Sequence, residues 1–243
     1  MSWVNRSSAH LKCRVFVDFD GTIAVEDTTD LLLERFALAE WQAIEADWTA
    51  GRIGSRECMV RQIDLVRATP EAMDAFIGAI EIDPAFPRFV EVCRRLGHEL
   101  TVVSDGLDRT VGAVLQRNGL DLAFRANRLA WTGGDRWRLS FPHARSDCAA
   151  LAGNCKCQFA EAARYSARIV VGDGRSDFCI AERADLVLSK GALTRHCAEN
   201  ALPHVAFNGF DHAIGILEGW LAAKGGERRA EADASRRPIN GNG

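Results

Sequence analysis

The amino-acid sequence predicts an α/β fold, in which a mostly parallel sheet is covered by helices on both faces and carries one inserted helical module. Short apolar, β-branched runs alternate along the chain with segments of helical periodicity, a pattern typical of parallel sheets. Three of these runs stop at acidic or glycine-containing tripeptides, where strands of such sheets meet a ligand. After the first run, the chain stays helical over residues 26–81, which predicts a separate helical module.

Length and composition narrow the class of protein. With 243 residues, 47% of them hydrophobic, the chain can bury a large core. The net charge of −3 is spread along the sequence without a basic stripe, so nothing indicates binding to nucleic acid or to an anionic membrane. No apolar run approaches the ~20 residues that span a bilayer, and the polar start lacks the apolar segment of a signal peptide. We therefore expect a soluble cytoplasmic protein whose cysteines are reduced.

The first predicted strand, residues 11–17, stops at two carboxylates, Asp18 and Asp20. Residues two apart on an extended chain face the same side, so both acids would point into one small volume. Carboxylates held this close repel each other, which suggests a divalent metal ion between them. Gly21 permits a sharp turn, and Thr22 offers a hydroxyl or backbone N–H group to an anion. Taken alone, Asp-x-Asp-Gly is also a common sequence of surface turns. The choice between a catalytic site and a turn therefore depends on the rest of the chain.

Four short helices are expected in the inserted module. Asp27 or Thr28 can cap the first helix, Gly51 stops the second, and Thr69 caps the fourth. The helices are expected near residues 28–38, 40–50, 55–66 and 70–80. Trp41 and Trp48 have helical spacing and are expected to pack inside the module.

Strands and helices alternate in the rest of the chain. We expect helices near residues 84–96, 107–116, 157–166, 176–183 and 210–222. Strands are expected at 100–103, 122–124, 169–171 and 186–188, with a β-hairpin at 128–141. The sheet domain then comprises residues 11–25 and 82–222, the helical module 26–81, and a polar, disordered tail 223–243.

Three strand ends are expected to form one site, because ligands bind at the carboxyl ends of strands in such sheets. The three are Asp18-Phe19-Asp20, Ser104-Asp105-Gly106 and Gly172-Asp173-Gly174. These groups still lack a positive charge. Lys156, at an expected helix start, is the best candidate for it, ahead of Lys12 and Lys190.

This set of groups suits phosphoryl transfer, which needs an in-line nucleophile, a metal ion and donors around the phosphoryl oxygens. Asp18 is expected to attack phosphorus and carry an aspartyl-phosphate, and Asp20 to serve as general acid and base. Mg²⁺ would be held by Asp18, Asp20 and Asp173. Ser104 and nearby backbone N–H groups would hold the phosphoryl oxygens. Supporting roles are expected for Thr22, Gly106 and Asp177.

Four segments, taken together, resemble the motifs of the haloacid dehalogenase superfamily. They are Val17–Ile23, Val102–Gly106, Lys156 and Val171–Asp177. The resemblance implies a Rossmann-like sheet with the small helical cap of the phosphoserine phosphatase branch. It also implies a Mg²⁺-dependent phosphomonoesterase with an aspartyl-phosphate intermediate, because the second acid, Asp20, is typical of the phosphatases rather than the dehalogenases.

Finer similarities concern the substrate. The segment from Pro142 to Lys156 resembles the loop of the methionine-salvage phosphatases that act on 2-hydroxy-3-keto-5-methylthiopentenyl-1-phosphate, although it is shorter. Phosphoethanolamine/phosphocholine phosphatases have a similar cysteine-rich loop. Asp27 and Arg61 match substrate-binding positions of these groups. Asp105 stands where many relatives have a second glycine, and it is the third candidate substrate-binding residue.

Several assignments have a second interpretation. Asp27 also suits helix capping, and Arg61 a solvated helix face. One group of residues near Lys156 could bind zinc or could consist of packed thiols: His143, Cys148, Cys155 and Cys157. The spacing of these residues is not a common tetrahedral zinc pattern. Alternative functions also stay open. The chain could be a phosphatase for phosphoserine or for phosphoethanolamine/phosphocholine, a phosphotransferase, or a non-catalytic phospho-acceptor. The expected partner is a small phosphorylated metabolite, and the chain is expected to be a monomer or homodimer.

Overall fold

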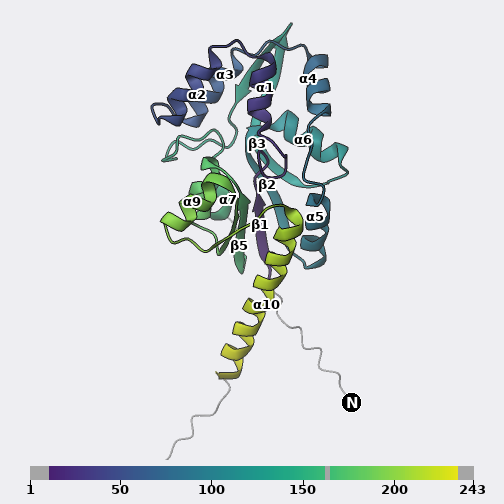
Figure 1. Cartoon of the computed structure of the whole chain (residues 1–243), viewed down its shortest axis with the longest axis vertical. Helices are drawn as coiled ribbons and strands as arrows, with labels where there is room; N and C mark the ends of the chain where they lie inside the picture. Colours follow the sequence, from purple (N-terminus) through teal and green to yellow (C-terminus); the bar gives the residue numbers. More distant parts are fainter. Residues whose placement is uncertain (1–10, 162–164, 235–243) are drawn as a thin grey trace, which may run out of the picture.

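The computed structural model describes residues 11–161 and 165–234, and within them the chain builds a seven-stranded sheet (Figure 1). The strand order is β4-β3-β2-β1-β5-β6-β7. Neighbouring strands run parallel except for the β3–β4 pair, which is antiparallel. The strands are β1 (Cys13–Val17), β2 (Glu99–Leu107), β3 (Ala123–Gly133), β4 (Arg136–Ser140), β5 (Ala167–Gly172), β6 (Leu186–Ser189) and β7 (His204–Ala206). The predicted fold class is confirmed.

Helices cover both faces of the sheet, because successive side chains of each strand point to opposite sides. Val15 and Val17 of β1 belong to the core of one face, and Phe16 to the core of the other. The first face is covered by α5 (Phe86–Arg95), α6 (Asp108–Arg117) and α10 (Phe210–Ala234). The second is covered by α7 (Cys157–Glu161), α8 (Phe178–Ala181) and α9 (Gly191–Glu199).

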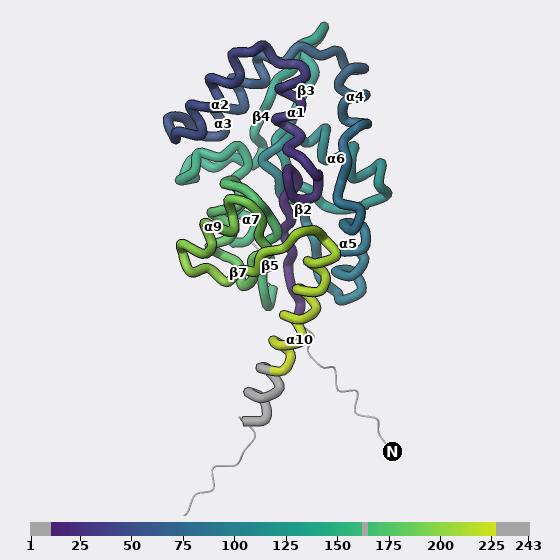
Figure 2. Tube along the Cα trace, in the orientation of Figure 1, coloured from purple at the N-terminus to yellow at the C-terminus, as the bar shows by residue number. Residues whose placement is uncertain are grey.

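The inserted helices form a cap at one end of the molecule, beyond the carboxyl ends of strands β1 and β2 (Figures 1 and 2). They are α1 (Thr28–Phe36), α2 (Trp41–Thr49), α3 (Ser55–Ile63) and α4 (Pro70–Gly78). Two predicted N-caps are present: the Asp27 carboxylate accepts hydrogen bonds at the start of α1, and the Thr69 hydroxyl does so at the start of α4. Residues of the cap and of the sheet domain share one hydrophobic cluster, so the cap is packed onto the sheet domain.

The β3–β4 hairpin supports the cap. The expected short strand and the first strand of the expected hairpin are one continuous strand, β3, which pairs with β2 at its start and with β4 at its end. Trp131 lies opposite Trp137 in this hairpin. The buried Trp137 donates its indole N–H to the carbonyl oxygen of Ala68 in the cap at 2.8 Å, whereas Trp131 is half exposed.

The C-terminal part differs from the predicted pattern. Two elements in this part, helix α9 and strand β7, were not predicted. Strand β7 is short and two of its three side chains are exposed, so it lacks a strand-like alternation. Helix α10 continues to Ala234, beyond the expected end at residue 222, because alanine, lysine, arginine and glutamate, which favour helices, outnumber Gly225 and Gly226 in this segment. The rest of the expected tail, 235–243, and the lead-in at 1–10 lie outside the described residues. None of the helices in the described ranges is long and apolar enough to cross a membrane.

Candidate active site

A buried ion-paired group follows the end of β1. The Asp18 Oδ1 atom lies 2.7 Å from Lys156 Nζ, and the same Nζ lies 2.7 Å from Asp177 Oδ1. All three side chains are almost completely buried, with Asp18 6% exposed and the other two 1%. Lys156 therefore joins the segments after β1 and β5, as the sequence predicted, and it compensates two carboxylates at once.

Asp173 completes an acidic cluster with these residues. One carboxylate oxygen each of Asp18, Asp173 and Asp177 lies within 4.8 Å of the others. Burial and the charge of Asp177 raise the pKa of Asp18, and the same two causes raise the pKa of Asp173 to about 6. Burial alone would lower the pKa of Lys156, but the charges of Asp177 and Asp18 raise it. Thr22 donates its hydroxyl to Asp173 at 3.3 Å.

The cluster suits a divalent cation. Three carboxylates face one ammonium group, so negative charge is in excess, and hard carboxylate oxygens are the ligands that Mg²⁺ prefers. Asp177 is already engaged: its Oδ2 accepts the backbone N–H groups of Asp173 and Gly174 at 3.2 and 3.4 Å. Asp18 and Asp173 are therefore the carboxylates best able to hold the ion, while Asp177 holds Lys156 and the loop after β5.

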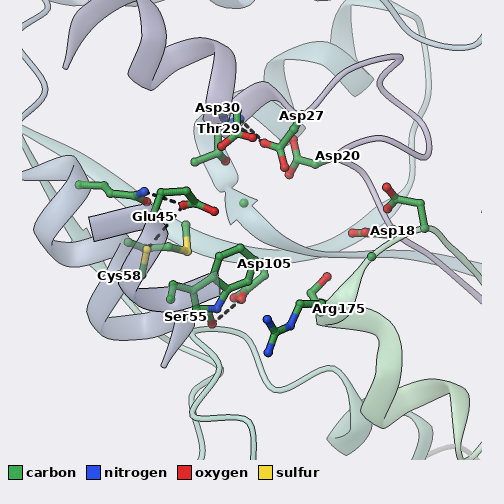
Figure 3. A pocket seen from close by; sticks show the side chains of 17 residues that line it. Asp18, Asp20, Asp27, Thr29, Asp30, Glu45, Ser55, Cys58, Asp105 and Arg175 are labelled. Carbon is green, nitrogen blue, oxygen red and sulfur yellow. Dashed lines mark hydrogen bonds between the residues drawn. The ribbon is translucent and has the colours of Figure 1, made fainter. Parts of the chain in front are cut away.

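Asp20 points away from this cluster, toward Asp27 and the cap (Figure 3). Its Oδ1 accepts hydrogen bonds from the N–H and hydroxyl of Thr28 at 3.0 and 2.5 Å, and its Oδ2 accepts one from the Ser104 hydroxyl at 3.3 Å. Burial and the charge of Asp27 raise the pKa of Asp20 to about 7, which suits proton transfer near neutral pH.

Asp18, Asp20 and Asp173 were expected to hold the metal ion together. In the structure, the Asp20 carboxylate lies outside the acidic cluster, which contains Asp18, Asp173 and Asp177. The expectation assumed an extended chain through Asp20. The strand ends at Val17, and the backbone turns through Gly21, whose φ is +65°.

Two glycines allow the close approach of the catalytic segments. A Cβ atom on Gly21 would lie 2.5 Å from an oxygen of Asp173, in addition to the strain of its positive φ. A Cβ on Gly106 would lie 2.4 Å from an oxygen of Asp20. The N–H of Gly106, expected to face a phosphoryl oxygen, donates instead to the Ser104 hydroxyl oxygen at 2.8 Å. Ser104 thus links β2 to Asp20.

A cleft separates the acidic cluster from the cap. Residues of the sheet domain that line it include Asp18, Asp20, Asp105, Gly106, Asp173, Gly174, Arg175 and Ser176. The cap contributes Asp27, Thr29, Asp30, Glu45, Trp48, Ser55, Cys58, Met59 and Gln62. Burial, and then the charges of Asp27 and Glu45, raise the pKa of Asp30 to about 7, so the cap wall has its own acidic character.

Arg175 is a cleft residue that the sequence analysis missed. It lies beside the cleft, opposite the cap (Figure 3), donates an N–H to the carbonyl oxygen of Thr49 at 3.2 Å, and has its guanidinium 5.5 Å from the centre of the Trp48 ring. Its place just after Asp173 in the chain was the available signal. Trp48, expected inside the cap, instead lines the cleft.

The candidate substrate-binding residues have different positions. Asp27 caps α1, as one interpretation predicted, and its side chain also lines the cleft. Asp105 lines the cleft too. Arg61 is not a cleft residue; it lies on the outer face of α3, where its guanidinium is 3.5 Å from Glu57 and 3.9 Å from Asp47. The helical period explains this, because the cleft-facing positions of α3 are Ser55, Cys58, Met59 and Gln62.

The thiols near Lys156 form a packed group. Cys155 and Cys157 have sulfur atoms 3.2 Å apart, and burial and hydrogen bonds with Cys157 and Cys148 raise the pKa of Cys155. The His143 ring instead lies edge-on to Phe159. Cys148, Cys155 and Cys157 pack together, and among the residues that the structure describes this group does not bring three donor atoms within 4.8 Å of one another.

The other two lysines have partners of their own. Lys12 Nζ lies 2.9 Å from a carboxylate oxygen of Glu99, and Lys190 Nζ lies 4.7 Å from the centre of the Phe207 ring. Neither side chain lines the cleft. Lys156, whose Nζ contacts both Asp18 and Asp177, is thus the lysine of the acidic cluster.

A parallel sheet with acidic strand ends, a buried lysine between them and a helical cap above them defines a capped hydrolase of the α/β class. A family model described as haloacid dehalogenase-like hydrolase matches residues 15–182. The chain belongs to the haloacid dehalogenase-like hydrolases, and the expectation of a phosphatase of this family is confirmed.

Similar proteins agree with this assignment. A protein of Brevibacillus brevis named 2-hydroxy-3-keto-5-methylthiopentenyl-1-phosphate phosphatase is 30% identical over 215 residues, covering 85% of this chain and 96% of the relative. A Geobacillus kaustophilus protein of the same name is 30% identical over 213 residues, covering 84% and 94%. A solved structure described as a phospho-aspartyl intermediate analogue of phosphoserine phosphatase has the same fold, with a TM-score of 0.65 and 21% identity, covering 85% of this chain and 99% of the other.

Proposed function

We propose that this phosphatase is a Mg²⁺-dependent phosphomonoesterase that hydrolyses a small phosphorylated metabolite through an aspartyl-phosphate on Asp18. The observation that carries the proposal is the buried contact of Asp18 with Lys156, beside Asp173 and Asp177. Lys156 orients the Asp18 carboxylate and opposes the rise of its pKa that burial causes, which favours the ionised oxygen that attacks phosphorus.

Asp20 then supplies the proton transfers. With a pKa raised to about 7, it can protonate the oxygen of the leaving alcohol and later accept a proton from the water that cleaves the aspartyl-phosphate. Thr28 and Ser104 hold its carboxylate by three hydrogen bonds. When bound by Asp18 and Asp173, Mg²⁺ would offset the charge of the phosphoryl oxygens.

The substrate we propose is 2-hydroxy-3-keto-5-methylthiopentenyl-1-phosphate, an intermediate of methionine salvage. Relatives of that name match this chain over almost their whole length. The cap wall also offers Trp48, Cys58 and Met59, whose soft and apolar surfaces suit a methylthio group.

A phosphomonoester with an amine is the second candidate, such as phosphoserine, phosphoethanolamine or phosphocholine. The observation in its favour is the acidic part of the cap wall. Asp27, Asp30 and Glu45 line the cleft together, and the charges of the other two contribute to the raised pKa of Asp30. A cationic group among them would relieve this repulsion.

The test is phosphate release from these four phosphomonoesters, with Mg²⁺ and with chelator. Asp18→Asn is the inactive variant, and Asp121→Asn is the matched control because Asp121 is exposed and outside the cleft. We expect metal-dependent release with one preferred substrate, lost in Asp18→Asn and kept in Asp121→Asn. Release by Asp18→Asn would refute the mechanism. A phosphorylated chain that passes its phosphoryl group only to an organic acceptor would indicate a phosphotransferase, and one that keeps it a phospho-acceptor.

A further inference from the structure

The carboxylate of Asp105 lines the cleft, yet both of its oxygens are engaged by protein donors. Oδ1 accepts a hydrogen bond from the backbone N–H of Asn154 at 2.7 Å and another from the side-chain amide of Asn127 at 3.1 Å. Oδ2 accepts the hydroxyl of Ser55 at 2.8 Å. Asp105 and Ser55 are both labelled in Figure 3, which draws this last bond.

These donors come from three separate parts of the chain. Ser55 is the first residue of α3 in the cap, and Asn127 lies on β3. Asn154 belongs to the loop that leads to Lys156, and its side-chain amide donates to the carbonyl oxygens of Ser104 and Arg125 at 2.8 and 2.9 Å. One carboxylate therefore connects the cap, the sheet and the Lys156 loop, next to Ser104.

Given the proposed function, we propose that Asp105 is a positioning residue: its carboxylate fixes α3 and the Lys156 loop relative to Ser104. The cap wall of the cleft then keeps a constant distance from the groups that act on phosphorus. Displacement of α3 would move Met59 and Gln62, which line the cleft. Displacement of the loop would move Lys156, and with it Asp18.

This role differs from a contact with substrate in what it requires of Asp105. A positioning role requires hydrogen-bond geometry, whereas recognition of a cationic substrate requires the negative charge. In Asp105→Asn, the amide oxygen can still accept from Asn154 and Asn127, and the amide NH₂ can donate to the Ser55 oxygen. In Asp105→Ala, the Asn154 N–H and the Ser55 hydroxyl lose their acceptor, which carries a penalty when they are buried. The Asn127 amide keeps only the backbone carbonyl oxygen of residue 105, at 2.6 Å.

The first experiment measures kcat and KM for p-nitrophenyl phosphate and phosphoethanolamine. We expect Asp105→Ala to lower kcat/KM for both on the order of tenfold or more, because small misplacements of catalytic groups have large effects on rate. Asp105→Asn should stay within about twofold of the unaltered chain, since it keeps the network. Ser55→Ala combined with Asp105→Ala should be no worse than Asp105→Ala alone.

The second experiment measures backbone hydrogen exchange by mass spectrometry and needs no enzymatic activity. Exchange should become faster in residues 55–63 and 148–157 of Asp105→Ala and stay unchanged in Asp105→Asn. The matched control is Asp74→Ala, which removes a different contact between cap and sheet domain, the 2.6 Å hydrogen bond from Arg109. Asp74 does not line the cleft, so its loss should leave KM and exchange in 148–157 unchanged.

Two results would overturn the positioning role. One is an Asp105→Asn variant that loses phosphoethanolamine hydrolysis as fully as Asp105→Ala while keeping p-nitrophenyl phosphate hydrolysis, which would show that the charge binds substrate. The other is unchanged exchange in a folded Asp105→Ala, or in Ser55→Ala if the former does not fold. A chain that hydrolyses no phosphomonoester would refute the proposed function alone, because the exchange data would still decide the role of Asp105.

Discussion

The two walls of the cleft hold their carboxylates in opposite ways. On the sheet domain, Asp18 and Asp177 are almost completely buried and share Lys156. On the cap, Asp27 is exposed and Asp30 is partly exposed, and Asp27 accepts hydrogen bonds from backbone N–H groups at the start of α1. A buried charge without its partner is costly, whereas an exposed one is replaceable. The contrast suggests that the sheet domain determines the reaction and the cap the substrate.

Removal of the buried cation should have the largest effect. Lys156→Met leaves Asp18 and Asp177 facing each other without compensation, so we expect the free energy of unfolding without metal to fall by about 3–5 kcal/mol. We also expect kcat to fall by roughly 10² or more, because Asp18 loses the group that orients it. Chemical denaturation and steady-state kinetics measure both. Unfolding at the denaturant concentration of the unaltered chain would show that Lys156 is not needed to balance the cluster.

The second largest effect is expected from metal removal, which should affect the sheet-domain wall of the cleft and not the cap wall. Chelator should abolish activity, and Mg²⁺ at about 100 times its Kd should stabilise the fold by about 2.7 kcal/mol, a rise in Tm of roughly 5–10 °C for a chain of this size. Asp173→Asn should lose this rise, and Asp30→Asn on the cap should keep it, because Asp30 is not in the acidic cluster. Equal rises in both variants would mean that the ion binds elsewhere.

Arg175 connects the two walls of the cleft, since it belongs to the sheet domain and contacts Thr49 and Trp48 of the cap. We expect Arg175→Ala to raise KM about fivefold to tenfold while kcat changes less, because the lost contacts are with the cap rather than with Asp18. Arg175→Lys keeps the charge without the planar guanidinium and should be intermediate. A fall in kcat with KM unchanged would instead place Arg175 among the groups that act on phosphorus.

The smallest expected effect is the pH dependence of Asp30. Its pKa of about 7 in the folded chain lies above the value near 3.9 of an unfolded chain, so ionisation of Asp30 disfavours folding. Its contribution to stability is complete below pH 4 and is lost as the pH rises to about 7. Asp30→Asn should therefore match the unaltered chain at pH 4 and exceed it at pH 8, by less than about 1 kcal/mol because the group is partly exposed. Thermal unfolding at both pH values checks this, and a variant less stable at pH 8 would contradict it.

The same contrast explains what could be predicted from sequence. The fold class and the grouping of Asp18 with Asp173 follow from strand ends, which topology brings to one edge of the sheet. Lys156 directly precedes α7 and was predicted as the missing positive charge. The direction of Asp20 could not be predicted, because it depends on how the chain turns at Gly21 after β1 ends.

The cap wall was less predictable for a related reason. Arg61 and Met59 lie on the same helix, and only the rotation of α3 against the sheet domain decides that Met59 faces the cleft. That rotation depends on tertiary contacts such as Ser55 with Asp105, which no local pattern encodes. Helix α10 beyond residue 222 was missed because a polar, charged segment suits both a disordered tail and a solvated helix.

During turnover, Asp18 should carry the phosphoryl group, and rapid acid quenching would trap it there. The protein would be mixed with excess preferred substrate and Mg²⁺, quenched within one turnover, digested, and its peptides sequenced by mass spectrometry. We expect a phosphoryl group on Asp18, absent from Asp18→Asn and present on the same residue in Asp121→Asn. Phosphate release without any phosphorylated peptide, or with the phosphoryl group on another residue, would contradict it.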